Sequence, residues 1–189
     1  AETAPSSPPP PPLPRGVPRD MGPGVVALDL VPGKAGGLFA ESGDEVRVLL
    51  KGRLFAKQGW IFTNDYAETD DRGLPRPHVF TLGAGEVIDG LDVGCLGLRE
   101  GGVRRVVASP PASYRDKTQE PIPRDFSNRQ RLWTTVFNPT RIANGEGDTL
   151  STTVWDVELV RVTKKKGGDG GGRDADANAN DDDAFSLPL

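Results

Sequence analysis

Two segments of this chain, residues 42–55 and 152–163, alternate apolar and polar side chains with the period of a β-strand. The apolar set is Val46, Val48, Leu50, Trp155, Val157 and Leu159, and the polar set between them includes Arg47, Lys51, Asp156 and Glu158. A sheet with one buried and one solvated face produces this alternation. The sequence therefore predicts a half-buried antiparallel sheet.

Three shorter apolar segments supply further strands. They are residues 24–33, which end in a Pro-Gly turn, residues 78–83, and residues 102–109, which stop before two prolines. One helix is needed to cover the apolar face of such a sheet. Val87, Ile88, Leu91 and Cys95 are spaced three to four residues apart, which places them on one side of a helix. These segments predict an α+β domain.

The two ends of the chain differ in composition from its middle. Residues 1–22 are rich in proline, which fixes φ and favours a stiff polyproline II segment. This segment is either a plain tether or a ligand for an aromatic groove on a partner. Residues 164–189 are rich in Gly and Asp and predict a solvated, disordered tail, unless the acidic run binds a basic partner. The folded domain is therefore expected at residues 23–163.

Composition excludes several classes of function. The net charge of −4 lacks the excess of positive charge that is typical of nucleic-acid-binding proteins. The only cysteine, Cys95, allows no intrachain disulfide, and the only histidine, His78, argues against a His-based zinc site or a catalytic triad. No apolar run is long enough to span a bilayer. Since the chain does not begin with Met, we expect its numbering to start after removal of a targeting segment.

The glycine-rich stretch GAGEVIDGLDVG, residues 83–94, raises the question of a phosphate-binding loop. A P-loop needs a Lys after its last glycine, and a dinucleotide loop needs a third glycine that is missing here. Glu86 and Asp89 would also repel a phosphate. We therefore expect these glycines to shape the turn into a short helix and the loop that leaves it, with no nucleotide or other cofactor.

Several of these segments resemble the FKBP family of peptidyl-prolyl isomerases. The resemblance is carried by SGDEVRV (42–48), FTLGAGEVIDGLDVGCLGLREGGVRRVV (80–107), SPPASY (109–114) and TTVWDVELVRV (152–162). It covers nearly the whole expected domain in the family's order. It implies a curved antiparallel sheet wrapped around one short α-helix, with a proline pocket between the helix and the concave face.

A long insertion at about residues 124–151 precedes the last strand. Its sequence FSNRQRLWTTVFN resembles the insertion of chloroplast thylakoid-lumen FKBPs of plants and algae, which implies that compartment; the alternative is an unrelated surface insertion. Its apolar and aromatic residues either pack back on the domain or form a contact patch for a partner. These residues are Phe126, Leu132, Trp133, Val136 and Phe137.

The family's chemistry needs no nucleophile, metal or general base. Rotation about an X-Pro amide has a barrier of about 20 kcal/mol because it breaks amide resonance. The twisted amide is less dipolar than the planar one, so a dry apolar pocket favours it when remote contacts retain the substrate. The resemblance implies that Phe62 and Trp155 are the aromatic walls of this pocket and that the Tyr114 hydroxyl donates to a substrate carbonyl.

The substrate-binding residues that the resemblance implies are Val87, Ile88, Leu91, Phe80 and His78. Among these, the Ile88 backbone N–H could hold a second substrate carbonyl, and Phe80 would lie beneath the others in the core. From the sequence alone, the apolar members and the aromatic walls could equally be ordinary core residues. Tyr114 and His78 could equally lie on the surface.

At some positions the chain departs from the family's pattern. Leu91 and His78 stand where an aromatic is common, Leu50 stands where a Tyr is common, and Thr63 replaces an acid, although Asp65 is near. These changes widen the pocket floor and remove polar anchors. They predict a weak isomerase, or alternatively a chaperone or assembly factor that has lost most activity, or a structural subunit docked through the insertion.

The partners that the resemblance implies are proline-containing client proteins, with a photosynthetic membrane complex as one candidate. The chain is expected to act on them as a monomer.

Overall fold

The computed structural model describes residues 16–165 of the chain. Residues 1–15 of the Pro-rich segment and residues 166–189 of the tail, for which we predicted a spacer and a disordered tail, lie outside the described residues.

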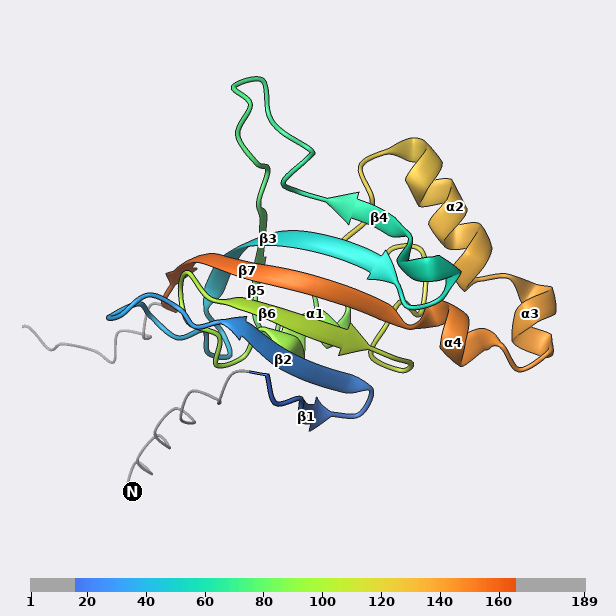
Figure 1. Ribbon diagram of the computed structural model, residues 1–189, viewed down its shortest axis with the longest axis horizontal. Helices are drawn as coiled ribbons and strands as arrows, with labels where there is room; N and C mark the ends of the chain where they lie inside the picture. The colour runs from blue at the N-terminus through green and yellow to red at the C-terminus, as the bar shows by residue number, and fades with distance from the viewer. Residues whose placement is uncertain (1–15, 166–189) are drawn as a thin grey trace, which may run out of the picture.

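Seven strands form one antiparallel sheet in the order β1-β2-β6-β7-β3-β4, with β5 paired to β3. The strands are β1 (Arg19–Gly22), β2 (Val25–Val31), β3 (Glu45–Leu54), β4 (Ile61–Asn64), β5 (His78–Thr81), β6 (Val103–Ala108) and β7 (Thr153–Thr163). In Figure 1 the long strands β3 and β7 run through the middle of the sheet, with β4 above them and β1 at the lower edge. The predicted α+β class with an antiparallel sheet and a short helix is confirmed.

Every segment predicted as a strand is a strand, but the sheet starts earlier than expected. Strand β1 falls within residues 1–22, which composition assigned to a linker, and it pairs with β2 through Arg19 and Ala27. The prolines end at Pro18 before the strand and resume at Pro23 after it, so a four-residue edge strand between them is compatible with the composition.

Strands β3 and β7 form the centre of the core. Their register places Leu50 opposite Val157 and Gly52 opposite Trp155. A Cβ atom on Gly52 would lie 2.5 Å from Cζ3 of Trp155 and 2.9 Å from Cζ of Phe62. Glycine at this position therefore lets two large rings pack directly on the sheet.

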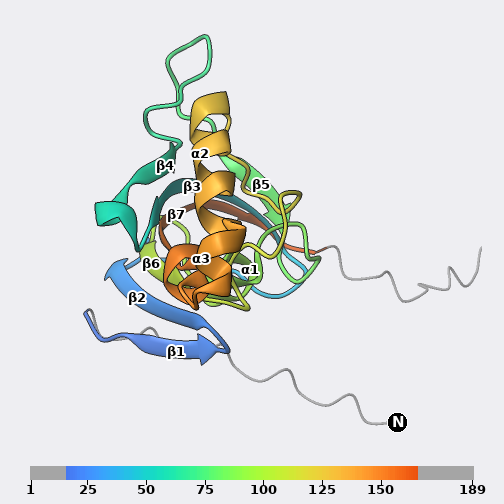
Figure 2. The same cartoon turned by 90° about the vertical axis from the view of Figure 1, so that its right-hand side faces the viewer.

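Helix α1 (Asp89–Gly94) packs against β6 and β2 on the concave side of the sheet, as Figure 2 shows. Its C-terminal end is fixed by Arg104, a buried residue of β6 whose Nη1 donates to the carbonyl oxygens of Gly94 at 2.9 Å and Leu96 at 2.7 Å. The charge of Arg104 is paired with Asp29 of β2, with 2.5 Å between Nε and Oδ1. A cation that satisfies the last carbonyls of a helix also complements its dipole. Arg104 thus sets the position of the helix relative to the sheet.

The insertion before β7 is helical. Its elements are α2 (Phe126–Val136), α3 (Pro139–Ala143) and α4 (Gly147–Ser151), and a short 3-10 helix, η1 (Lys57–Gly59), lies between β3 and β4. The side chain of Asp125 caps α2 by accepting a hydrogen bond from the Asn128 N–H at 2.7 Å. Leu132, Trp133 and Val136 of α2 are buried, whereas Phe126 is exposed. The insertion therefore packs back on the domain, with α2 contacting β4.

Candidate active site

Three aromatic residues from separate parts of the chain meet beneath the insertion. Phe62 comes from β4, Trp155 from β7, and Tyr114 from the loop after β6. The ring centroids of Phe62 and Trp155 are 5.2 Å apart, and each lies 6.4 Å from the centroid of Tyr114. The two closest rings meet edge to face, which is a favoured geometry for aromatic pairs. The structure thus brings together the three residues that we predicted as catalytic.

The predicted substrate-binding residues lie around this cluster. Val87 and Ile88, which directly precede α1, Leu91 of α1 and Phe80 of β5 belong to the same buried core as the three aromatic residues. The Trp155 indole Nε1 donates to the Thr153 hydroxyl at 2.9 Å, so its polar atom is satisfied inside the core. Leu91 is fully buried.

The aromatic cluster has almost no solvent-exposed surface. Phe62 and Trp155 are 0% exposed and Tyr114 is 4% exposed. Trp133 of α2 lies over Tyr114, with ring centroids 5.2 Å apart in an edge-to-face arrangement. We expected an open apolar pocket between the helix and the sheet, and in the described conformation this region is covered. Sequence patterns could not show this, because they do not tell where an insertion folds back.

Both hydrogen-bond donors assigned to a substrate are also occupied. The Ile88 N–H donates to the Glu120 carbonyl oxygen at 2.8 Å, and the Tyr114 hydroxyl donates to the Pro121 carbonyl oxygen. Pro121 itself is buried. Burial raises the pKa of Tyr114 well above its ordinary value, and the charge of Glu120 acts in the same direction, so the phenol stays a donor at neutral pH.

A buried carboxylate, Asp65, lies beside the cluster and takes polar contacts from three directions. Its Oδ2 accepts the Leu50 N–H at 2.8 Å and lies 2.9 Å from Nδ1 of His78, and its Oδ1 lies 3.2 Å from Nη1 of Arg124. The side chain of His78 is only 15% exposed, so it is not the surface residue that was one of its two alternatives. The neighbouring Thr63 is buried as well. Asp65 is thus a buried carboxylate two residues after Thr63.

Arg124 extends this polar group to the long hairpin between β4 and β5. Its Nη1 lies 3.4 Å from the Glu68 carboxylate, and its Nη2 donates to the Arg76 carbonyl oxygen at 3.2 Å. Sequence reasoning missed Arg124. A cation at the start of the expected insertion carries no signal of its own, since its partners are about fifty or more residues away.

A hollow of about 610 Å³ remains open next to the covered cluster. Three predicted substrate-binding residues, His78, Phe80 and Val87, contribute to its lining. The other lining residues are Pro77, Val79, Glu86, Glu120, Ile122 and Arg124. This hollow is the accessible part of the candidate site.

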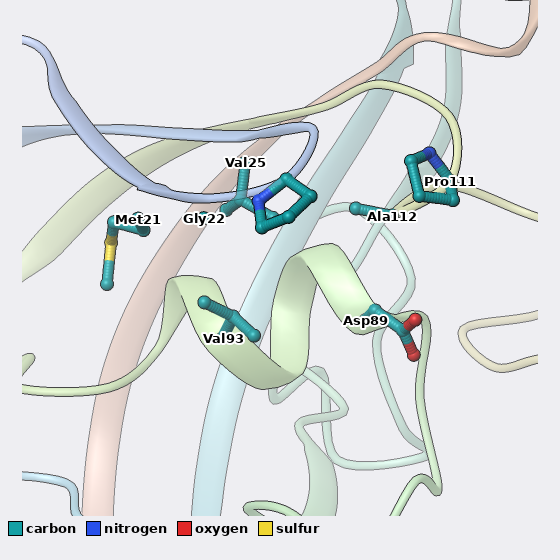
Figure 3. A pocket seen from close by; sticks show the side chains of 8 residues that line it. Met21, Gly22, Val25, Asp89, Val93, Pro111 and Ala112 are labelled. Atoms are coloured by element: carbon teal, nitrogen blue, oxygen red, sulfur yellow. The ribbon is translucent and has the colours of Figure 1, made fainter.

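A second hollow of about 260 Å³ lies beside α1. Figure 3 shows Asp89 and Val93 of the helix on one side of it, with Met21, Val25 and Ala112 on the other. None of the predicted site residues lines it. Among residues 16–165, no group of three or more His, Cys, Asp or Glu side chains could hold a metal ion. No helix within this range is long and apolar enough to cross a membrane.

Comparisons with known proteins find a family match and curated relatives. The model of the family "FKBP-type peptidyl-prolyl cis-trans isomerase" matches residues 36–160. The chain is 48% identical over 141 residues to peptidyl-prolyl cis-trans isomerase FKBP17-1, chloroplastic, of Arabidopsis thaliana, covering 75% of this chain and 61% of that protein. It is 30% identical over 135 residues to FKBP19, chloroplastic, of the same plant, covering 67% of this chain and 49% of the relative.

The fold is shared with a solved structure. The N-terminal domain of FKBP42 from Arabidopsis thaliana superposes with a TM-score of 0.51 at 13% identity, covering 82% of this chain and 98% of that one. By contrast, the chain spans less than two thirds of the length of each of the two curated relatives, FKBP17-1 and FKBP19.

Proposed function

Because the chain belongs to the FKBP-type peptidyl-prolyl cis-trans isomerases, we propose that it catalyses rotation about X-Pro bonds in proline-containing client proteins. The observation that carries this proposal is the convergence of Phe62, Tyr114 and Trp155 at the N-terminal end of α1, beside the Ile88 N–H. Three rings give an apolar wall, and two donors give the contacts that hold a peptide on it.

The residues suit a mechanism without reactive side chains. A prolyl ring against Phe62 and Trp155 would be surrounded by apolar surface, where the less dipolar, twisted amide is favoured over the planar one. The Ile88 N–H and the Tyr114 hydroxyl would retain the peptide through carbonyl oxygens next to the rotating bond. The Tyr114 phenol is protonated at neutral pH, and burial raises its pKa further above its ordinary value.

We propose that the basal activity is weak, since the walls are covered in the described conformation. Phe62 and Trp155 have no exposed surface, and the third residue, Tyr114, is held by Pro121 and packed under Trp133, so a client can reach the walls only after a local rearrangement. Of the predicted binding residues, His78, Phe80 and Val87 already line an open hollow, where a client could first bind.

A matched pair of substitutions tests the proposed activity. Phe62→Leu removes a wall of the candidate site, whereas Phe39→Leu removes a half-buried ring that contacts Arg99 instead. We expect Phe62→Leu to lower kcat/KM on an X-Pro peptide by about tenfold, the effect of losing about 1.4 kcal/mol of transition-state stabilisation. Phe39→Leu is expected to leave the rate unchanged. Circular dichroism checks that both variants fold, and equal rates for folded wild type and Phe62→Leu would remove the proposal.

The covered walls favour a second candidate function, a chaperone or assembly factor that binds clients with little catalysis. Suppression of aggregation of an unfolded client separates the two functions. A pure binder would suppress aggregation without accelerating X-Pro isomerisation, and its suppression would be the same in wild type and Phe62→Leu.

We also propose a chloroplast location, supported by the names of the two plant relatives, and within it the thylakoid lumen, with a photosynthetic membrane complex among the clients. Import of the precursor into isolated chloroplasts tests this. The protein should resist added protease until the thylakoids are lysed. The chain is proposed to act as a monomer, which sedimentation velocity would check.

A further inference from the structure

The segment formed by residues 119–124, here called the strap, makes the contacts that a bound peptide would need. Its Glu120 carbonyl accepts the Ile88 N–H, and its Pro121 carbonyl accepts the Tyr114 hydroxyl. An X-Pro client would present the same two groups, the carbonyl before its proline and the carbonyl of the proline itself. The backbone of the strap also runs parallel to the segment before α1, because Glu120 and Val87 form a parallel β-bridge.

The strap is tied down at both ends by polar contacts. At its start, the Gln119 side chain accepts the Arg115 N–H at 2.6 Å. At its end, Arg124 binds the carboxylates of Asp65 and Glu68 and the carbonyl oxygen of Arg76. Asp65 is fully buried, so its pairing with Arg124 is less screened by solvent than a surface ion pair. Arg124 is therefore the stronger of the two attachments.

We infer that the strap is an internal competitor that occupies the proline site with its own Glu120-Pro121 segment and must be released before a client enters. This inference rests on the proposed function and adds its regulation. Arg124 sets how often the strap opens, because it joins the strap to the β4–β5 hairpin. The open hollow of about 610 Å³ is lined both by strap residues and by His78, Phe80 and Val87, so a client bound there lies beside the strap that it replaces.

Amide hydrogen exchange at Ile88 reports on strap opening, since the acceptor of this N–H is the Glu120 carbonyl oxygen of the strap. Arg124→Met removes all contacts of the guanidinium and keeps its apolar length. Glu68→Gln weakens one of them and leaves Asp65 paired. Arg129→Met is the matched control, because Arg129 lies in the same insertion but packs on the exposed Phe126 ring.

We expect exchange of the Ile88 amide to be about tenfold faster in Arg124→Met, and about two- to threefold faster in Glu68→Gln, because the second contact is longer and more exposed. Amides within β6 should exchange as in wild type. The isomerase kcat/KM should rise in the same order, and Arg129→Met should match wild type in both measurements.

Unchanged Ile88 exchange in folded Arg124→Met, or faster exchange that is shared equally by the β6 amides, would overturn the inference. If Arg124→Met does not fold, Glu68→Gln decides by the same criteria. Suppose that exchange is faster at Ile88 alone and that no variant catalyses isomerisation. This result would support the inference that the strap opens and would remove the proposed catalytic function. A higher exchange rate with a lower kcat/KM would show that the strap assists catalysis and would overturn its role as a competitor.

Discussion

Gly52 is the single residue on which the packing of the aromatic walls depends most directly. It lies opposite Trp155 in the β3–β7 register, and the rings of Trp155 and Phe62 occupy the space that a side chain would need. Its backbone has ordinary φ, so the requirement for glycine at this position comes from space alone. The candidate site therefore depends on an absent methyl group as well as on the rings themselves.

Gly52→Ala is expected to destabilise the fold by about 1–3 kcal/mol, because overpacking a rigid core forces rings out of place. Gly147→Ala is the matched control. Gly147 also has ordinary φ and begins α4, but a Cβ there would meet its nearest atom at 3.7 Å. Urea unfolding followed by tryptophan fluorescence gives both values. A Gly52→Ala variant as stable as Gly147→Ala would show that the rings can shift freely.

The helix α2 is the element that covers the aromatic cluster from the side of Tyr114. Its buried face carries Leu132, Trp133 and Val136, and Trp133 contacts both Tyr114 and Phe137. The helix begins after Arg124, so the cover over the site and the strap beside it are continuous in sequence. A short connection therefore joins α2 to the strap.

Trp133→Ala is expected to cost about 3–5 kcal/mol of folding stability, because it removes a large buried ring and leaves a cavity. Phe126→Ala, on the exposed face of the same helix, should cost about 0.5 kcal/mol or less. Thermal and urea unfolding of the two variants measure the difference. Similar costs at both positions would mean that α2 does not pack on the domain in solution.

Most strands and α1 could be predicted from sequence, whereas the edge strand β1 and the cover over the site could not. A strand with one buried face imposes alternation on its own residues, as at Val46, Val48 and Leu50, so the pattern is local and visible. No local sequence pattern predicts the burial of Trp133, since its burial depends on Tyr114, which is distant in sequence. The hydrogen bond from Leu50 to Asp65 and the contacts of Arg124 are likewise long-range.

Over the whole described molecule, the sequence predicted which residues gather at the site but not the state in which they are held. Phe62, Tyr114 and Trp155 were identified from the family's motifs, and the sheet and helix bring them together. Whether a pocket is empty depends on every segment that can fold over it. The openness of a pocket is therefore a property of the complete tertiary structure, and no single motif predicts it.

Because the thiol of Cys95 is buried, the stability of the whole domain is expected to fall at alkaline pH. Burial raises its pKa to about 12, from the model-compound value of 9.0, with the charge of Arg104 acting in the opposite direction. The folded state therefore keeps this proton at pH values where the unfolded chain has lost it. By linkage, the contribution of Cys95 is fully present below about pH 9 and is lost as the pH rises from 9 toward 12.

We expect the free energy of unfolding of wild type to fall by on the order of 1 kcal/mol per pH unit across this window, from this one group. Cys95→Ala removes the titrating group, so its unfolding free energy should fall less steeply, although its value near pH 7 is lower because of the cavity. Tyr114, whose pKa is also raised by burial, adds a further loss above about pH 10 in both proteins. Urea unfolding at a series of pH values from 7 to 10 isolates the difference in slope. Parallel curves for the two proteins would show that the thiol ionises in the folded state as readily as in the unfolded chain, and hence that the end of α1 is open to water.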